Sequence, residues 1–238
     1  MIWARARVGV RTEVGTGLVI FDCDGVLVDS EPIASRVLAD LLTEIGFPMS
    51  AEGALDRYTG ITLPAVLAKV EEEWGRPLPR DFLDRLRARD QAAFRAELQP
   101  VPGVTAVLDA LDAAGMRKCV ASSGAPEKLR LTLTVTGLWD RFAPHIYSAA
   151  QVPRGKPWPD LFLHAAAAMA VPAQACLVVE DSSAGIKAAR AAGMRVIGFA
   201  GGGHAGPGYA GMLAEAGAET VVPDMPALGR LLAAAAPA

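Results

Sequence analysis

Six short apolar runs, most of them separated by segments of helix length, restrict the fold of this chain more than any other feature of its sequence. The runs do not alternate apolar and polar residues, which is typical of parallel strands covered on both faces. Helix-like segments at 104–115 and 183–193 each end in a glycine, which suits the position just past a helix. This pattern predicts an α/β fold with a doubly wound parallel sheet. The six runs span residues 17–22, 117–123, 143–149, 175–181, 194–200 and 219–224.

One interval interrupts this pattern between the first and second predicted strands. It contains no strand-like run, and a structureless loop of that length would be unusual in a compact protein. Its sequence instead favours helices at 33–46, 63–75 and 79–98. We therefore expect a helical domain of residues 32–99, inserted into a core domain formed by residues 17–31 and 100–238.

Composition narrows the possible partners. The 238 residues carry a formal net charge of −3, so no basic face for nucleic acid is expected. The apolar run LVIF is far too short to cross a membrane, and no apolar stretch of signal-peptide length follows the basic N-terminal residues. We expect residues 1–16 to form a frayed extension. Cys23, Cys119 and Cys176 have no zinc-site spacing, which favours reduced thiols in a cytoplasmic protein.

Two carboxylates, Asp22 and Asp24, follow the first predicted strand in the sequence FDCDG. In open α/β sheets ligands bind beyond the carboxyl ends of the strands, which is where this pair lies. Residues two apart in an extended chain point the same way, so both side chains are expected to face one site. Taken alone, the pattern fits an acidic turn equally well.

Polar residues also follow three other strand-like regions. Ser122 and Ser123 end the second strand, Lys156 lies between turn formers in RGKPWPD, and Glu180 and Asp181 end the run ACLVV. Each feature is weak alone. Together, acids, hydroxyls and a lysine at successive strand ends predict a site for a divalent cation and a phosphate group.

The ordered motifs DxDGVLVDSE, ASS, GKPxPD and VVEDSxAGIxAAxAAGM resemble the haloacid-dehalogenase-like hydrolase superfamily. They are most similar to its sugar-phosphatase and β-phosphoglucomutase-like branch, and they extend over nearly the whole chain from residue 18 onward. The resemblance implies a Rossmann-like core carrying a helical cap. It also implies a phosphatase that acts on a small phosphorylated sugar, polyol or sugar acid, and a monomer.

The resemblance assigns roles to the strand-end residues. Asp22 would be the nucleophile that forms an aspartyl-phosphate, and Asp24 the general acid and base. Mg²⁺ would be held by Asp22, the backbone carbonyl of Asp24 and Asp181, with Glu180 assisting directly or through water. Ser122 and Lys156 would hold the phosphoryl oxygens, and Lys156 would also neutralise Asp22.

The cap is expected to select the substrate, because the chemistry of such a core is shared among many reactions. The segment DRYTGIT at 56–62 resembles the cap loop that reaches the active site in this branch. Arg57, Gly60 and Thr62 are therefore candidate substrate contacts, together with Ser123 on the core. A solvated helix position remains an equal alternative for Arg57.

Other activities of the superfamily stay as alternatives. A β-phosphoglucomutase-type mutase is disfavoured because no histidine lies at 33–35, and a dehalogenase because Asp24 is present. A phosphonate hydrolase would need a cap lysine, for which Lys69 is the candidate. A catalytically idle binding protein is the alternative from another class, and the intact set of acids and Lys156 argues against it.

The glycine-rich sequence GGGHAG at 201–206 invites a dinucleotide-binding interpretation. The strand before it comes late in the order, and Pro207 and Gly208 extend the loop where a helix should begin. A mobile loop at the rim of the pocket is preferred, with His204 as a surface histidine.

Overall fold

The computed structural model describes residues 15–59 and 62–235. At its centre lies a parallel sheet with the strand order β3-β2-β1-β4-β5-β6, which confirms the predicted fold class. Each strand falls within one of the six apolar runs. The strands are β1 (Leu18–Phe21), β2 (Lys118–Ser122), β3 (Ile146–Ser148), β4 (Cys176–Glu180), β5 (Arg195–Phe199) and β6 (Thr220–Val222).

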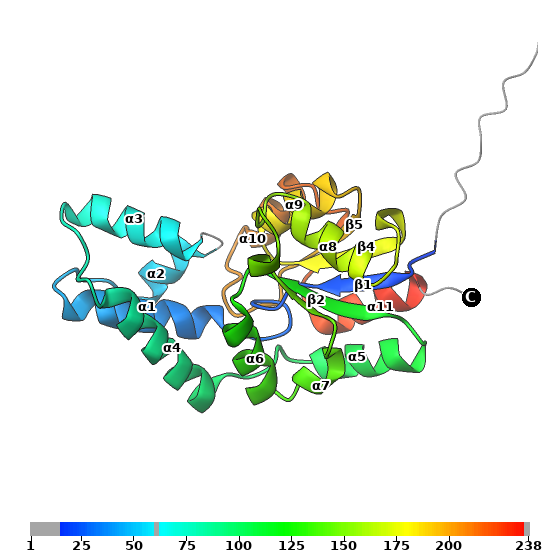
Figure 1. The fold of residues 1–238 in the computed structure, drawn as a ribbon, viewed down its shortest axis with the longest axis horizontal. Coiled ribbons are helices and arrows are strands. Elements are labelled where there is room, and N and C mark those ends of the chain that lie inside the picture. The colour runs from blue at the N-terminus through cyan, green and yellow to red at the C-terminus, as the bar shows by residue number, and fades with distance from the viewer. Residues whose placement is uncertain (1–14, 60–61, 236–238) are drawn as a thin grey trace, which may run out of the picture.

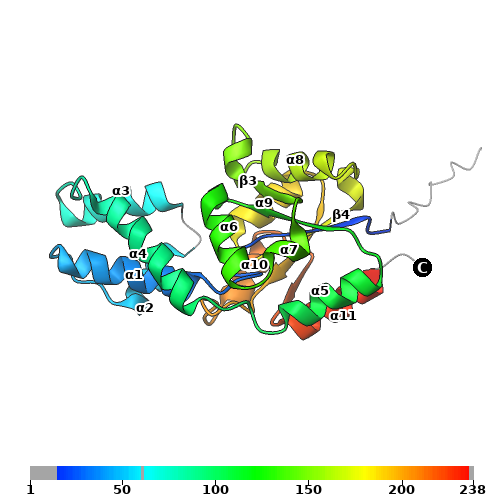
Figure 2. The same ribbon diagram turned by 60° about the horizontal axis from the view of Figure 1, so that its bottom comes forward.

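Helices cover both faces of the sheet (Figures 1 and 2). One face packs against α5 (Val104–Ala113), α6 (Pro126–Val135), α7 (Trp139–Phe142) and α11 (Met225–Ala235). The other packs against α8 (Asp160–Ala168), α9 (Ser183–Ala191) and α10 (Tyr209–Glu215). All four residues of β1 are fully buried between these layers, which is why its sequence is apolar without alternation. Two short 3₁₀ helices, η1 (Ala149–Gln151) and η2 (Ala173–Ala175), complete the core.

A separate group of helices lies beside the sheet, at the left of Figure 1. It consists of α1 (Glu31–Glu44), α2 (Ala51–Tyr58), α3 (Leu63–Trp74) and α4 (Phe82–Glu97), and these helices share an apolar cluster of their own. Helix α2 was not among the helices predicted from the sequence, and residues 56–58, expected in a loop, form its last turn. The division into a cap at 32–99 and a core stays a prediction.

The two connections between this helical group and the sheet run side by side. Asp29 N donates to Gln99 O at 3.1 Å, and Val101 N donates to Leu27 O at 3.0 Å. These hydrogen bonds join the outgoing and returning segments close to the end of β1, where the polar residues gather. No helix in the described part of the chain is long and apolar enough to span a membrane.

Candidate active site

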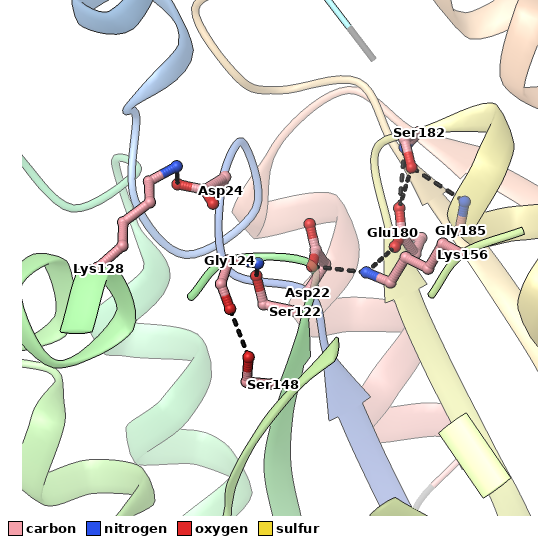
Figure 3. Close-up of polar contacts among 10 residues, drawn as sticks. All are labelled: Asp22, Asp24, Ser122, Gly124, Lys128, Ser148, Lys156, Glu180, Ser182 and Gly185. Carbon is pink, nitrogen blue, oxygen red and sulfur yellow. Dashed lines mark hydrogen bonds and ion pairs between the residues drawn. The ribbon is translucent and has the colours of Figure 1, made fainter. Parts of the chain in front are cut away.

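The polar strand ends meet between β1 and β4, where the strand order reverses direction. Asp22 follows β1, Glu180 ends β4, and Lys156 reaches them from the segment before α8 (Figure 3). Such a switch point is where open α/β sheets leave a crevice at the carboxyl ends of their strands. The topology therefore brings together residues that are far apart in the sequence.

Lys156 lies between two of the carboxylates. Its Nζ is 2.7 Å from Asp22 Oδ1 and 2.5 Å from Glu180 Oε1, and all three side chains are at least nine-tenths buried. Burial alone would lower the pKa of Lys156, but Asp22 and Glu180 outweigh it and raise that pKa. The ammonium group therefore stays charged and holds the two acids in place.

Glu180 is fixed from its other side by the start of α9. Its Oε2 accepts hydrogen bonds from the backbone N and the Oγ of Ser182, both at 2.9 Å. The same Ser182 Oγ accepts from Gly185 N at 3.0 Å and so caps the helix. A Cβ on Gly185 would lie 1.8 Å from Glu180 Oε1, so the close packing of helix against carboxylate requires glycine here.

Asp22, Glu180 and Asp181 form a buried acidic triad, in which one oxygen from each residue lies within 4.8 Å of the others. Burial raises the pKa of Asp22, and Glu180 and Asp181 act in the same direction against Lys156. Burial likewise raises the pKa of Asp181. Three carboxylates facing one ammonium leave an excess of negative charge. Because carboxylate oxygens are the ligands that Mg²⁺ prefers, these residues fit a divalent hard cation.

Asp24 lies differently from what the sequence suggested. Its Oδ1 is 2.9 Å from Lys128 Nζ on α6 and accepts a hydrogen bond of 2.5 Å from Ser30 Oγ. In Figure 3 the side chain points to Lys128, whereas Asp22 points to Lys156. The expectation that both carboxylates face one site is thus not met in this conformation. The extended chain ends here, because Gly25 turns it with a positive φ of 76°.

The environment of Asp24 also favours its charged form. Burial alone would raise the pKa of Asp24, but Lys128 and the Ser30 hydroxyl outweigh it and hold that pKa below its ordinary value. The environments of these two neighbouring carboxyls therefore shift their pKa values in opposite directions, upward for Asp22 and downward for Asp24. Such a separation is typical of paired acids with different tasks.

The two serines that follow β2 occupy unlike positions. Ser122 is buried, and its Oγ accepts a hydrogen bond of 3.1 Å from Gly124 N. Ser123 is exposed. Ser148, at the end of β3, donates to Gly124 O at 2.7 Å and holds the loop from the neighbouring strand. Ser122 thus lies at the carboxyl end of β2, close to Asp22, as Figure 3 shows.

The candidate substrate contacts of the helical group lie at the ends of α2 and α3. Arg57 is in the last turn of α2, and its Nη1 is 3.3 Å from Glu73 Oε2 on α3. Thr62 is exposed and directly precedes α3, while Gly60 lies outside the described residues. A role for these residues in binding substrate stays a prediction.

Three residues near the site were not predicted from the sequence: Lys128, Ser30 and Tyr209. Lys128 does carry a signal, because it lies in the first turn of α6, where the helix dipole disfavours a cation. A further residue, His204, was expected at the surface, but that expectation is wrong. It is only 6% exposed, and its Nε2 lies 3.1 Å from Asp181 Oδ2.

Comparison with known families agrees with this arrangement. The model of the haloacid dehalogenase-like hydrolase family matches residues 19–199, which includes the acidic triad and Lys156. The chain belongs to this family. The haloacid dehalogenase-like hydrolase resemblance inferred from the ordered motifs is therefore confirmed.

Relatives within the family act on different phosphorylated compounds, as their names state. The 6-phosphogluconate phosphatase of Escherichia coli K12 is 35% identical over 182 residues, covering 76% of this chain and 81% of the relative. Hexitol phosphatase B of the same strain is 31% identical over 180 residues, covering 75% and 81%. A family member from Deinococcus radiodurans R1, solved with bound phosphate and sodium, is 36% identical, has a TM-score of 0.79, and matches over 93% of this chain and 97% of its own.

Proposed function

We propose that this hydrolase is a Mg²⁺-dependent phosphatase that cleaves a small phosphate monoester of a sugar, polyol or sugar acid. The observation that carries the proposal is the contact of Lys156 with Asp22, a member of the buried acidic triad. A carboxylate held against an ammonium beside a cation site suits attack on an anionic phosphate. The two phosphatase relatives support the substrate class.

The reaction would proceed in two displacements at phosphorus. In the first, a carboxylate oxygen of Asp22 bonds to phosphorus while the bond to the ester oxygen breaks. Asp24 donates a proton to the leaving alkoxide, giving an alcohol and an aspartyl-phosphate. In the second, water attacks phosphorus, Asp24 takes its proton, and inorganic phosphate leaves with Asp22 regenerated.

Asp22, Glu180, Asp181 and the backbone carbonyl of Asp24 would hold Mg²⁺. The cation supplies positive charge that lets an anionic nucleophile meet an anionic phosphate. Lys156 keeps Asp22 in place and, with Ser122, would bind the transferring phosphoryl oxygens.

Asp24 must leave Lys128 for its proton transfers. Because Asp24 contacts Lys128 and Ser30 beside the connections to α1–α4, we infer that movement of this helical group accompanies its release. The helices would act as a cap that excludes water, with Arg57, Gly60, Thr62 and Ser123 selecting the substrate. We further propose a monomeric, cytoplasmic enzyme whose partner is a small metabolite. The burial of all three free cysteines supports a reducing compartment.

The proposal is tested by phosphate release from a panel of sugar, hexitol, sugar-acid and glycolate phosphates in the presence of Mg²⁺. Release should be lost in Asp22→Asn and after EDTA treatment, and should return when Mg²⁺ is restored to the wild type. Asp109→Asn is the matched control, because Asp109 lies on α5 with a side chain that is 64% exposed. Absence of release from every substrate would contradict the proposal, and an isomerised phosphosugar without free phosphate would point to a mutase.

A further inference from the structure

His204 is buried beside the acidic triad, although the proposed reaction assigns it no task. Its Nε2 lies 3.1 Å from Asp181 Oδ2 and 3.0 Å from the Tyr209 hydroxyl, and its ring packs edge-on against that of Tyr209. The side chain is fully covered. A buried polar ring in contact with a triad member calls for a physical reason.

The hydrogen-bonding environment selects one tautomer of the imidazole. Nδ1 is buried and has no hydrogen-bond partner among the described residues, whereas Nε2 faces two oxygen atoms. A proton on Nδ1 would bury an unpaired N–H and turn a bare Nε2 lone pair toward the carboxylate. A proton on Nε2 satisfies the contact with Asp181. His204 therefore presents a donor to Oδ2 of that carboxylate.

The loop that carries His204 is packed tightly enough to hold this donor in place. Gly203 N donates to Asp29 Oδ1 at 2.9 Å, which ties the loop to the segment leading into α1. A Cβ on Gly202 would lie 2.6 Å from His204 Cε1, and one on Gly25 would lie 1.9 Å from Asp181 Oδ2. These glycines let the loop, the turn after β1 and Asp181 approach one another closely.

We propose that His204 is a positioning residue that orients Asp181 for the metal, and that Tyr209 in turn fixes the imidazole. A histidine N–H bound to one carboxylate oxygen restricts the rotation of that carboxylate, which leaves the other oxygen directed for coordination. The inference rests on the metal site of the proposed function. It goes beyond that site by giving the glycine-rich sequence at 201–206 the task of presenting His204.

The test is Mn²⁺ binding, measured by electron paramagnetic resonance on the full chain without substrate. His204→Leu introduces an apolar side chain of similar size and removes the hydrogen-bond donor, so Mn²⁺ affinity should fall about 10- to 100-fold. His204→Gln can place an amide N–H near the Nε2 position and should restore most of the affinity. Tyr209→Phe should weaken binding by less than His204→Leu. His164→Leu is the matched control, because His164 lies on α8 and its ring packs against Tyr147 on the edge strand β3, away from β5 and the loop that carries His204.

The outcomes separate this inference from the proposed function. A wild-type protein that binds no Mn²⁺ would overturn the metal site and the role of His204 together. Wild-type affinity in a folded His204→Leu would overturn the role of His204 alone, and so would equal losses in the Leu and Gln variants. In support, phosphatase activity of His204→Leu should recover at saturating Mg²⁺, because positioning affects metal affinity before it affects the chemical step. If His204→Leu does not fold, Tyr209→Phe carries the same test, and unchanged affinity there would contradict the inference.

Discussion

Lys128 Nζ lies 2.9 Å from Asp24 Oδ1, so the proposed general acid forms an ion pair outside the acidic triad. The ammonium group also sits 5.7 Å from the centre of the Phe94 ring on α4. Lys128 thus links the core helix α6, the carboxylate after β1 and the helical group. In this position it controls both the charge and the direction of Asp24.

Replacing Lys128 with Met should change the pH dependence of the reaction. Without the ammonium, burial dominates the environment of Asp24 and its pKa rises. The acid step needs a protonated Asp24, so the basic limb of the kcat/KM profile should move to higher pH. Lys128→Arg keeps the charge and should leave that limb in place. Superimposable profiles of the wild type and Lys128→Met would refute this role of Lys128.

Replacing Gly185 with Ala should damage the site through Glu180. The added Cβ would lie 1.8 Å from Glu180 Oε1, and that carboxylate is held by Ser182 and Lys156. We expect a loss of about 1–3 kcal/mol in unfolding free energy, as in other overpacked sites, together with weaker Mg²⁺ binding. Urea denaturation measures the first effect. Gly211→Ala in α10, where a Cβ meets open space, should instead stabilise by about 0.5–1 kcal/mol. Equal effects of the two substitutions would contradict the packing argument.

Asp90 on α4 should make stability depend on pH. Burial raises its pKa to about 7 from an ordinary value of 3.8, and its Oδ1 has no partner among the described residues. Between these pH values the folded state keeps a proton that the unfolded chain has lost, so this group lowers unfolding free energy as pH rises. The unfolding free energy of Asp90→Asn relative to that of the wild type should therefore increase from pH 5 to about pH 7 and then level off. Urea titrations at several pH values measure it, and a difference independent of pH would contradict this assignment.

Removing the metal should destabilise the folded protein. A cation bound only by the native triad stabilises it by about 2.7 kcal/mol at a concentration one hundred times its Kd. Thermal unfolding should therefore give a higher Tm with Mg²⁺ than with EDTA. Asp181→Asn removes one of three crowded carboxylates, so its Tm in EDTA should exceed that of the wild type while its response to Mg²⁺ is reduced. An Mg²⁺ response as large as that of the wild type would show that the metal binds elsewhere.

The sheet could be predicted from the sequence because its central strands are buried on both faces. Residues 18–21 and 176–179 are apolar throughout, and the polar residues that follow them mark the strand ends where the site lies. The motifs also identified the family. The contact between Lys156 and Asp22 spans 134 positions; the family resemblance implied it, and the observed strand order brings the two segments together.

The remaining features depend on tertiary contacts that local patterns do not encode. The direction of Asp24 is set by Lys128, which lies on α6, and by Ser30, which directly precedes α1. His204 is buried because Asp29 binds the backbone N–H of Gly203, and because Gly202 and Gly25 let the loop approach the turn after β1 closely. A glycine-rich loop seen only as sequence resembles an exposed one, so the burial of its histidine could not be predicted.

In the proposed mechanism Asp22 carries the phosphoryl group between the two displacements. The most direct measurement is rapid acid quenching of a single turnover with a reactive substrate from the panel, followed by peptide mass spectrometry. The two-displacement mechanism predicts a transient peptide containing Asp22 that is heavier by one phosphoryl group, absent from Asp22→Asn and longer-lived when Asp24 is replaced by Asn. Phosphate release at the wild-type rate from Asp22→Asn, or a phosphoryl group found on another residue, would contradict it.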